Sequence, residues 1–301
     1  MQKFDVIIIG LGPAGAAAAI YSSRAGLSSV IFEGNAPGGQ LSLTDKIENY
    51  PGTGAIEGWK LAMELVSQVE ACGAKIIYER ITKVELDSKI VETASGRFEG
   101  RTIIIAGGSK RRELGLDGEK KLVGKGISYC AVCDGGFYKD KTVAVVGGGE
   151  TAVSDALYLS KICKKVWLCH RRDSLRASKS KQILLDKCEN VQLLLSVNIA
   201  ELQFDTKLNG IRLDSGLEIP LDGLFVAIGS DPDTSLYSGL ALENGFILTD
   251  ESMATSIAGV YAAGDIRKKQ VRQIVTAASD GAIAAISAAE FLEKERVNDT
   301  N

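Results

Sequence analysis

Two cysteines three residues apart have the spacing in this chain that most directly suggests chemistry. Cys130 and Cys133 lie in the stretch YCAVCDGGF, and the carboxylate of Asp134 follows the second cysteine. A C-x-x-C pair can supply half of a metal site, close a small disulfide loop or exchange electrons with a partner. The pair alone does not choose among these uses, so the elements that must position it come next.

Length and composition describe an ordinary soluble globular protein. The 301 residues suffice for about two domains, with 45% hydrophobic and 24% charged residues and a net charge of -3. This charge gives no basic field for a nucleic acid, and the opening MQKFDVIIIGLGPAG is typical of a strand entering glycines rather than a signal peptide. We therefore expect a cytoplasmic protein without a membrane or nucleic-acid partner. In a reducing cytosol the other cysteines should be free thiols: Cys72, Cys163, Cys169 and Cys188.

A first dinucleotide-binding pattern occupies residues 4–34. An apolar strand enters GLGPAG, a helix of small residues follows, and a second strand ends at Glu33. Gly10 permits the tight turn, Gly12 lets backbone N–H groups approach a pyrophosphate, and Gly15 lets the helix pack closely on the strand. The carboxylate of Glu33 can accept hydrogen bonds from ribose hydroxyls. The residues predicted to bind here are Gly10, Gly12, Pro13, Ala14, Gly15 and Glu33.

A second pattern of the same kind occupies residues 141–177. An apolar strand enters GGGETA, a helix and a strand follow, and the acid of the first pattern is replaced by HRRDSLRA. An acid at this position would repel a 2′-phosphate, whereas guanidinium groups offer it bidentate hydrogen bonds. The second site therefore favours NADPH over NADH. The predicted contacts are His170, Arg171, Arg172 and Arg176.

A third segment, residues 259–292, fits a flavin. Its apolar strand stops at Gly264 and Asp265, and a helix of small residues begins near Gln273 and Ile274. Asp265 could accept hydrogen bonds from polyol hydroxyls, and the helix start would direct its positive end at negative charge on a reduced ring. Two dinucleotides in one oxidoreductase indicate a flavin and a nicotinamide, and the first pattern is then the FAD site.

Alternating apolar and polar residues predict β-meanders over residues 81–107 and 202–229. The fold class is therefore α/β, with two Rossmann-like dinucleotide-binding domains, each with a three-layer ββα-type sheet and a meander. The NADPH domain is inserted in the FAD domain. We predict an FAD-binding domain over 1–113 and 241–301, and an NADPH-binding domain with the C-x-x-C pair over 114–240.

In order and spacing, eight motifs resemble those of the bacterial-type low-molecular-weight thioredoxin reductases, nearly from end to end. They are GLGPAG, GGQL, IENYPG, CAVCDG, GGGETA, HRRDSLRA, GVYAAGD and RQIVTAA. The resemblance implies an enzyme, usually homodimeric, that binds FAD and NADPH and reduces the disulfide of thioredoxin. It adds flavin contacts at Gly39, Gln40, Leu41, Asn49 and Arg272, and repeats Asp265, Gln273 and Ile274. It also implies that the NADPH pyrophosphate is held by Gly149, Glu150, Thr151 and Ala152.

With this family in mind, redox exchange is the favoured use of the cysteine pair. A structural zinc site needs four ligands, and the chain has no second C-x-x-C, so we expect no metal. A disulfide that closes so small a loop removes little chain entropy. The resemblance implies that hydride passes from NADPH to the flavin, that Cys133 faces the flavin and that Cys130 attacks the partner. Asp134 would protonate the leaving thiolate, and a large rotation between domains would expose the pair.

Three alternatives stay open at this point. The electron donor could be ferredoxin, the acceptor could be another small redoxin, and a nucleotide-sensing module would have no turnover at all. The intact second nucleotide pattern disfavours ferredoxin, and the cysteine pair disfavours the sensor. The chain also departs from the family at Ala106-Gly107-Gly108 and at Asp233, which concerns the hinge rather than the reacting groups.

Overall fold

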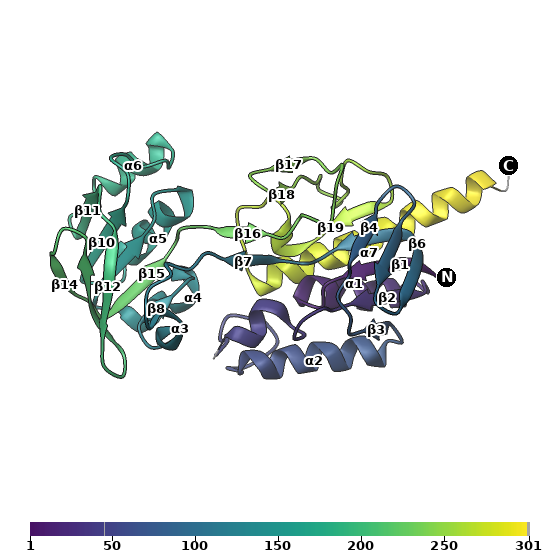
Figure 1. Cartoon of the computed structure of the whole chain (residues 1–301), viewed down its shortest axis with the longest axis horizontal. Helices are drawn as coiled ribbons and strands as arrows, with labels where there is room; N and C mark the ends of the chain where they lie inside the picture. The colour runs from purple at the N-terminus through teal and green to yellow at the C-terminus, as the bar shows by residue number, and fades with distance from the viewer. Residues whose placement is uncertain (45, 300–301) are drawn as a thin grey trace. The chain divides into compact units, whose positions relative to one another are not determined.

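The computed structural model describes residues 1–44 and 46–299, with side chains described as far as residue 297, and it separates into two compact units (Figure 1). The first unit comprises Met1–Lys110 and the chain from Asp231 onward, and the second comprises Arg111–Ser230. The chain passes between them in β7 (Ser109–Arg111) and β16 (Ser230–Pro232), which form a two-stranded sheet. The functional domain limits given above stay a prediction.

The first unit is built on a seven-stranded sheet with the order β3-β2-β1-β6-β5-β4, in which β19 also pairs with β6. Its central strands pair in parallel, and the β4-β5-β6 meander is antiparallel. A short hairpin, β17 and β18, pairs antiparallel outside this sheet. The strands are β1 (Gln2–Ile9), β2 (Ser29–Phe32), β3 (Lys75–Ile77), β4 (Lys83–Glu85), β5 (Ile90–Thr93), β6 (Gly96–Ile105), β17 (Leu242–Glu243), β18 (Phe246–Ile247) and β19 (Val260–Ala262).

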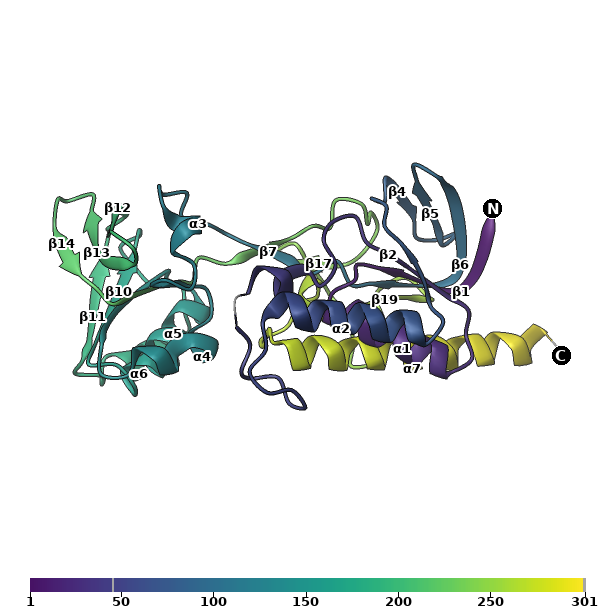
Figure 2. The ribbon, with the colours of Figure 1, turned by 90° about the horizontal axis from the view of Figure 1, so that it is seen from below.

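Three helices cover one face of this sheet: α1 (Pro13–Arg24), α2 (Gly58–Ala71) and α7 (Ile274–Asp299) (Figure 2). Alternate residues of β1 point to opposite faces, so Ile8 packs with the helices while Ile7 packs with the meander. Both side chains are fully buried. This arrangement is the three-layer sheet that the sequence predicted.

Small residues bring α1 and α7 close together. A Cβ atom added at Gly281 of α7 would lie 1.9 Å from the backbone oxygen of Ala14 in α1. By length and composition alone, residues Ile274–Val297 of α7 could cross a membrane, and they are the one such helix in the described part of the chain. Instead, Ala284, Ala285, Ala288 and Leu292 of this helix belong to the buried core.

The second unit has a five-stranded sheet with the order β11-β10-β9-β15-β8 and a separate three-stranded sheet. The strands of the first sheet are β8 (Ile127–Ser128), β9 (Thr142–Val146), β10 (Lys165–His170), β11 (Val191–Leu195) and β15 (Gly223–Val226). The second sheet comprises β12 (Ile199–Phe204), β13 (Leu208–Leu213) and β14 (Glu218–Pro220). The helices are α3 (Glu119–Leu122), α4 (Ala131–Asp134), α5 (Glu150–Ser160) and α6 (Lys179–Leu185).

Both predicted meanders are present, but they join their main sheets differently. In the first unit β6 is unbroken, so it pairs with β5 through its first half and with β1 along most of its length. In the second unit Pro220 ends β14 and is followed by Leu221 and Asp222 before β15 begins. Past Pro220, Leu221 donates to the Asn209 carbonyl of β13 at 3.0 Å, and Asp222 donates to the Thr142 carbonyl of β9 at 2.8 Å. The chain therefore passes from the meander to the main sheet between these two residues, and the second meander forms its own sheet.

Candidate active site

The first dinucleotide turn has the geometry that its glycines predict. Gly10 has a φ of 101°, and a Cβ atom there would lie 2.6 Å from the backbone oxygen of Ala106, the residue after β6. Gly12 is the N-cap of α1 and has no side chain to cap the helix, and Pro13 starts the helix. The first backbone N–H groups of α1 therefore lack a side-chain acceptor from the cap and can bind an anion.

The carboxylate of Glu33 holds the backbone of this turn through two hydrogen bonds. Its side chain is 8% exposed, and its two carboxylate oxygens accept the N–H groups of Leu11 and Asn35, each at 2.8 Å. Each oxygen keeps a further lone pair for a ribose hydroxyl. Glu33, the residue predicted to bind the ribose, thus also positions the turn. Its hydrogen bond to a ribose stays a prediction.

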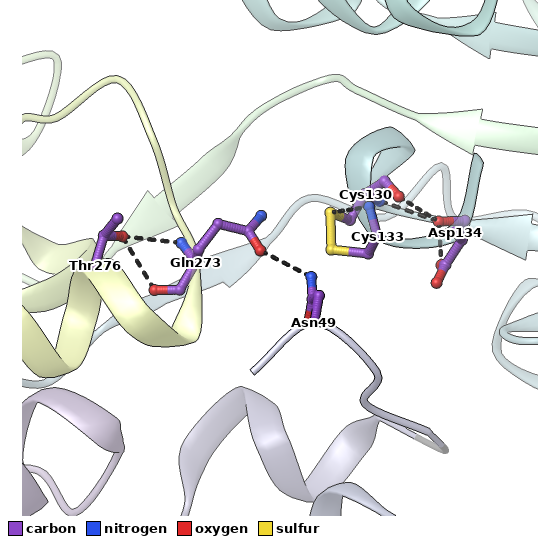
Figure 3. The surroundings of a disulfide bond; sticks show 7 residues. Asn49, Cys130, Cys133, Asp134, Gln273 and Thr276 are labelled. Carbon is purple, nitrogen blue, oxygen red and sulfur yellow. Dashed lines mark hydrogen bonds between the residues drawn. A yellow bond between two sulfur atoms is a disulfide. The ribbon is translucent and has the colours of Figure 1, made fainter. Parts of the chain in front are cut away.

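The predicted flavin residues of the first unit come from segments far apart in the chain. Gln40 lies in a short 3-10 helix, Gly39–Leu43, and its amide donates to the Ser109 carbonyl at 2.9 Å. Asn49 donates to the side-chain oxygen of Gln273 at 3.2 Å, although 224 residues separate them (Figure 3). This bond brings the IENYPG and RQIVTAA motifs together.

Arg272 is a half-buried cation beside the predicted flavin acid Asp265. Its guanidinium lies 4.4 Å from the ring centre of Phe246, and its Nε atom is buried with no hydrogen-bond partner among the described residues. Burial lowers the pKa of Arg272, and the negative charge of Asp265 opposes this effect. A polar ligand atom at this place would satisfy Nε, which fits the predicted flavin.

Asp280 is a site residue that the sequence patterns did not single out. Its carboxylate is 6% exposed and pairs with Arg267 at 3.1 Å and Lys269 at 2.7 Å. It also accepts the N–H of Gly264 at 3.0 Å, so it fastens the residue before Asp265 to α7. An acidic residue within a helix of small apolar residues was the one available signal.

The second dinucleotide turn also ends in a glycine that begins a helix, but it packs against the ring of His170. Gly148 needs no positive φ, but a Cβ atom there would lie 2.3 to 2.4 Å from three atoms of the His170 ring. Gly149 is the N-cap of α5, as Gly12 is of α1. His170 is 4% exposed, and its Nε2 atom is buried without a described partner. Burial and the adjacent arginines lower its pKa, so the ring is neutral near pH 7.

The predicted phosphate-binding arginines stand around this turn with their side chains exposed. The backbone N–H of Arg176 donates to the carbonyl of Gly148 at 2.7 Å. The carbonyl of Arg172 accepts the N–H of Ser196 at 2.9 Å, from the residue after β11. The structure thus gathers His170, Arg171, Arg172 and Arg176 next to Gly149, Glu150, Thr151 and Ala152 in the second unit.

Cys130 and Cys133 form a disulfide with a Cα–Cα distance of 5.3 Å (Figure 3). Cys130 is half-buried and caps α4, while Cys133 is exposed. The backbone N–H of Cys133 donates to Sγ of Cys130 at 3.2 Å. A hydrogen bond to sulfur favours the thiolate over the neutral thiol, so this bond prepares Cys130 to carry negative charge after the disulfide opens.

Ser128 holds Asp134 beside the disulfide, although the sequence motifs did not indicate a role for Ser128. Its hydroxyl donates to the Asp134 carboxylate at 2.6 Å and accepts the N–H of Cys130 at 3.0 Å. The N–H of Asp134 donates to the Cys130 carbonyl at 3.1 Å. Ser128 is 3% exposed at the end of β8, so a buried strand fixes the carboxylate that the sequence singled out.

The remaining cysteines are free thiols, as predicted. Burial raises the pKa of Cys163 to about 11 and that of Cys169 to about 12, so both stay protonated near neutral pH. In the described part of the chain, no three His, Cys, Asp or Glu side chains gather where they could hold a metal. Cys130 and Cys133 are the two cysteines of the chain that are joined in a disulfide.

Comparisons with known proteins show which family this chain resembles. Residues 4–281 match the pyridine nucleotide-disulphide oxidoreductase family. A thioredoxin reductase of Listeria monocytogenes is 42% identical, with 97% of this chain and 94% of that protein covered. One from Bacillus subtilis is 41% identical, with 97% and 95% covered. The crystal structure of thioredoxin reductase from Streptococcus pyogenes has a TM-score of 0.90 and 40% identity, covering 97% of this chain and 99% of that one.

Proposed function

Because the chain belongs to the pyridine nucleotide-disulphide oxidoreductase family, and within it to the bacterial-type thioredoxin reductases, we propose that it uses NADPH and FAD to reduce the disulfide of thioredoxin. The observation that carries the proposal is the Cys130–Cys133 disulfide, with Sγ of Cys130 accepting a backbone N–H. It lies in the same unit as the nucleotide turn flanked by arginines.

The residues of the first unit would hold FAD. The start of α1 would bind the pyrophosphate, Glu33 the ribose, and Asp265 the polyol chain, while Arg272 offers its buried Nε atom. Bound FAD would accept hydride from NADPH and supply the two electrons that open the disulfide. Asp280 and the Asn49–Gln273 hydrogen bond keep the three binding segments in register.

The residues of the second unit would select NADPH. The start of α5 would bind the pyrophosphate, and the exposed guanidinium groups of Arg171, Arg172 and Arg176 would pair with the 2′-phosphate. Neutral His170 supports the turn from beneath Gly148. This second nucleotide turn favours a nicotinamide donor over ferredoxin.

The exchange with thioredoxin then follows from the two sulfur atoms. The Cys130 thiolate attacks one sulfur of the acceptor disulfide, and a mixed disulfide forms while the other acceptor sulfur leaves as a thiolate. Asp134 would protonate that leaving thiolate. Cys133 next attacks Sγ of Cys130, which restores the disulfide and releases the second acceptor thiol. Two electrons and two protons have then passed to the acceptor.

The disulfide and the predicted flavin site belong to different units of the chain. A disulfide that rests on a flavin cannot at the same time be attacked by a folded protein. We therefore expect the second unit to rotate relative to the first about β7 and β16 during each cycle. Locking the units with an engineered crosslink should stop turnover while NADP⁺ binding persists.

Steady-state reduction of a bacterial thioredoxin tests the proposal. We expect turnover with NADPH, a much higher KM for NADH, and no turnover for the Cys133→Ser variant. The matched control is Cys188→Ser, because Cys188 is a free thiol outside the site. NADPH oxidation without formation of thioredoxin thiols would refute the assignment.

Assembly and location complete the proposal. By resemblance to the same family, we propose a homodimer that acts in the cytoplasm. Sedimentation at micromolar protein concentration would distinguish a dimer from a monomer, and cell fractionation would locate the protein.

A further inference from the structure

The loop that carries the three arginines, residues 171–178, has no helix or strand of its own. Its backbone is instead fastened at a few points. One is the bond from the N–H of Arg176 to the Gly148 carbonyl, and another is the bond from the N–H of Ser196 to the Arg172 carbonyl. Neither of these two bonds involves the end of the loop at Ser178.

Glu150, the first residue of α5, holds that far end. One oxygen of its carboxylate accepts the N–H of Ser178 at 2.5 Å, and the other pairs with Lys181 at 2.8 Å. Lys181 also donates to the hydroxyl of Ser154, one turn along α5, at 2.6 Å. Both bonds of Glu150 lower its pKa, so it is charged at neutral pH. One side chain therefore joins α5, the loop and the first turn of α6.

A carboxylate at this position is unfavourable for the binding of an anionic nucleotide. Two like charges about 4 Å apart repel by about 1 kcal/mol even in water. Glu150 lies at the start of the helix that would receive the pyrophosphate, so its charge opposes the binding proposed for this turn. The carboxylate of Glu150 lowers nucleotide affinity through its charge, but it also makes the two contacts with Ser178 and Lys181. These two contacts give a structural reason for an acid at this position.

We propose that Glu150 is a positioning residue that sets the preference for NADPH over NADH by holding the arginine loop through the N–H of Ser178. This inference rests on the proposed function. Bidentate pairing with a phosphate requires the guanidinium planes to be oriented before the ligand arrives. If the loop end is released, the cost of ordering it falls on binding of the 2′-phosphate. NADH has no 2′-phosphate, so its binding does not bear this cost.

The test measures binding and turnover of Glu150→Ala and Glu150→Gln. We expect Glu150→Ala to weaken NADP⁺ binding and to raise the KM for NADPH about three- to tenfold, the value of one hydrogen bond. NAD⁺ binding should not weaken, because NAD⁺ has no 2′-phosphate and the removed charge opposed the pyrophosphate, so the ratio of NADP⁺ to NAD⁺ affinity should fall. Glu150→Gln keeps an oxygen acceptor for Ser178, so it should keep the ratio of NADP⁺ to NAD⁺ affinity within about twofold of that of the wild type.

Isothermal titration of the FAD-loaded protein with NADP⁺ and NAD⁺ gives a readout that does not depend on turnover. Lys179→Ala is the matched control, since Lys179 is an exposed neighbour on α6. Lys181→Met is a second variant that leaves the Glu150–Ser178 bond in place, and a smaller loss of NADP⁺ affinity than for Glu150→Ala is expected. Melting temperatures identify any variant that fails to fold.

Two results would overturn the inference. If Glu150 acts only through its charge, Glu150→Ala tightens the binding of both nucleotides. If Ser178 needs no anchor, the ratio of NADP⁺ to NAD⁺ affinity does not change. The paired variant Arg171→Ala with Arg172→Ala separates this failure from that of the proposed function. Loss of NADP⁺ affinity in that variant alone rejects the role of Glu150, and no loss in either rejects the NADPH site itself.

Discussion

Replacing Gly148 with alanine would place a methyl group where the ring of His170 already lies. The new Cβ atom would be 2.3 Å from Cε1 and 2.4 Å from both ring nitrogens. An ordinary contact needs about 3.4 Å or more, so the ring or the turn must move by about 1 Å. His170 is 4% exposed and is surrounded by the core of the second unit, so the ring has little room to retreat.

The expected cost follows from this overlap. Overpacking of a buried site costs about 1–3 kcal/mol, and for a domain of this size that lowers the melting temperature by about 2–10 °C. The Gly148 carbonyl also accepts the N–H of Arg176, so a displaced turn moves the arginine loop. NADP⁺ affinity should therefore fall together with stability, while FAD content stays unchanged because the first turn is separate.

Thermal unfolding and NADP⁺ titration of four variants, Gly148→Ala, His170→Ala, their combination and Gly149→Ala, test this reasoning. Gly149→Ala is the control for stability, because its Cβ atom would meet nothing closer than 4.0 Å. The double variant Gly148→Ala with His170→Ala removes the ring and should recover part of the stability lost through Gly148→Ala, once the cost of His170→Ala alone is subtracted. A Gly148→Ala protein as stable as the wild type, or strictly additive effects, would refute the argument.

Three further predictions concern the redox pair, the arginines and a half-buried acid. Cys133→Ser should abolish thioredoxin reduction while NADPH still bleaches the flavin, as measured by stopped flow; loss of bleaching would contradict the assigned order of electron transfer. Arg171→Ala with Arg172→Ala should raise the KM for NADPH about 30-fold, because two exposed phosphate-pairing guanidiniums contribute about 2 kcal/mol; an equal change for NADH would contradict it. Burial raises the pKa of Asp155 to about 7 from 3.8, so its contribution to stability is lost as the pH rises through that range. Asp155→Asn should therefore raise the melting temperature more at pH 8 than at pH 5, and an equal change at both values would contradict the raised pKa.

Local patterns predicted the dinucleotide turns because their geometry depends on residues close in sequence. Gly10 and its helix start follow directly from strand, glycines and small residues in order. The alternation of apolar and polar residues likewise predicted both meanders. It did not predict that the second meander would form a sheet of its own, because that outcome depends on the backbone partners that Leu221 and Asp222 find in two different strands.

Residues that act through long-range contacts were beyond the reach of the patterns. Asn49 was assigned to the flavin only through a family resemblance, and its hydrogen bond to Gln273 joins residues 224 apart. Ser128 and Asp280 carry no motif at all, yet each fixes a proposed site residue or its neighbour from a buried position. Such roles depend on which segments meet in space, and a single sequence does not record that.

Anaerobic titration with NADPH, counting thiols and flavin absorbance together, tests most directly whether electrons leave the protein through the cysteine pair. If they do, the wild type should consume about two equivalents of NADPH per bound flavin and expose two new thiols, and Cys133→Ser should consume about one. Full bleaching of the flavin by about one equivalent, with Cys130 and Cys133 still joined, would contradict the proposal.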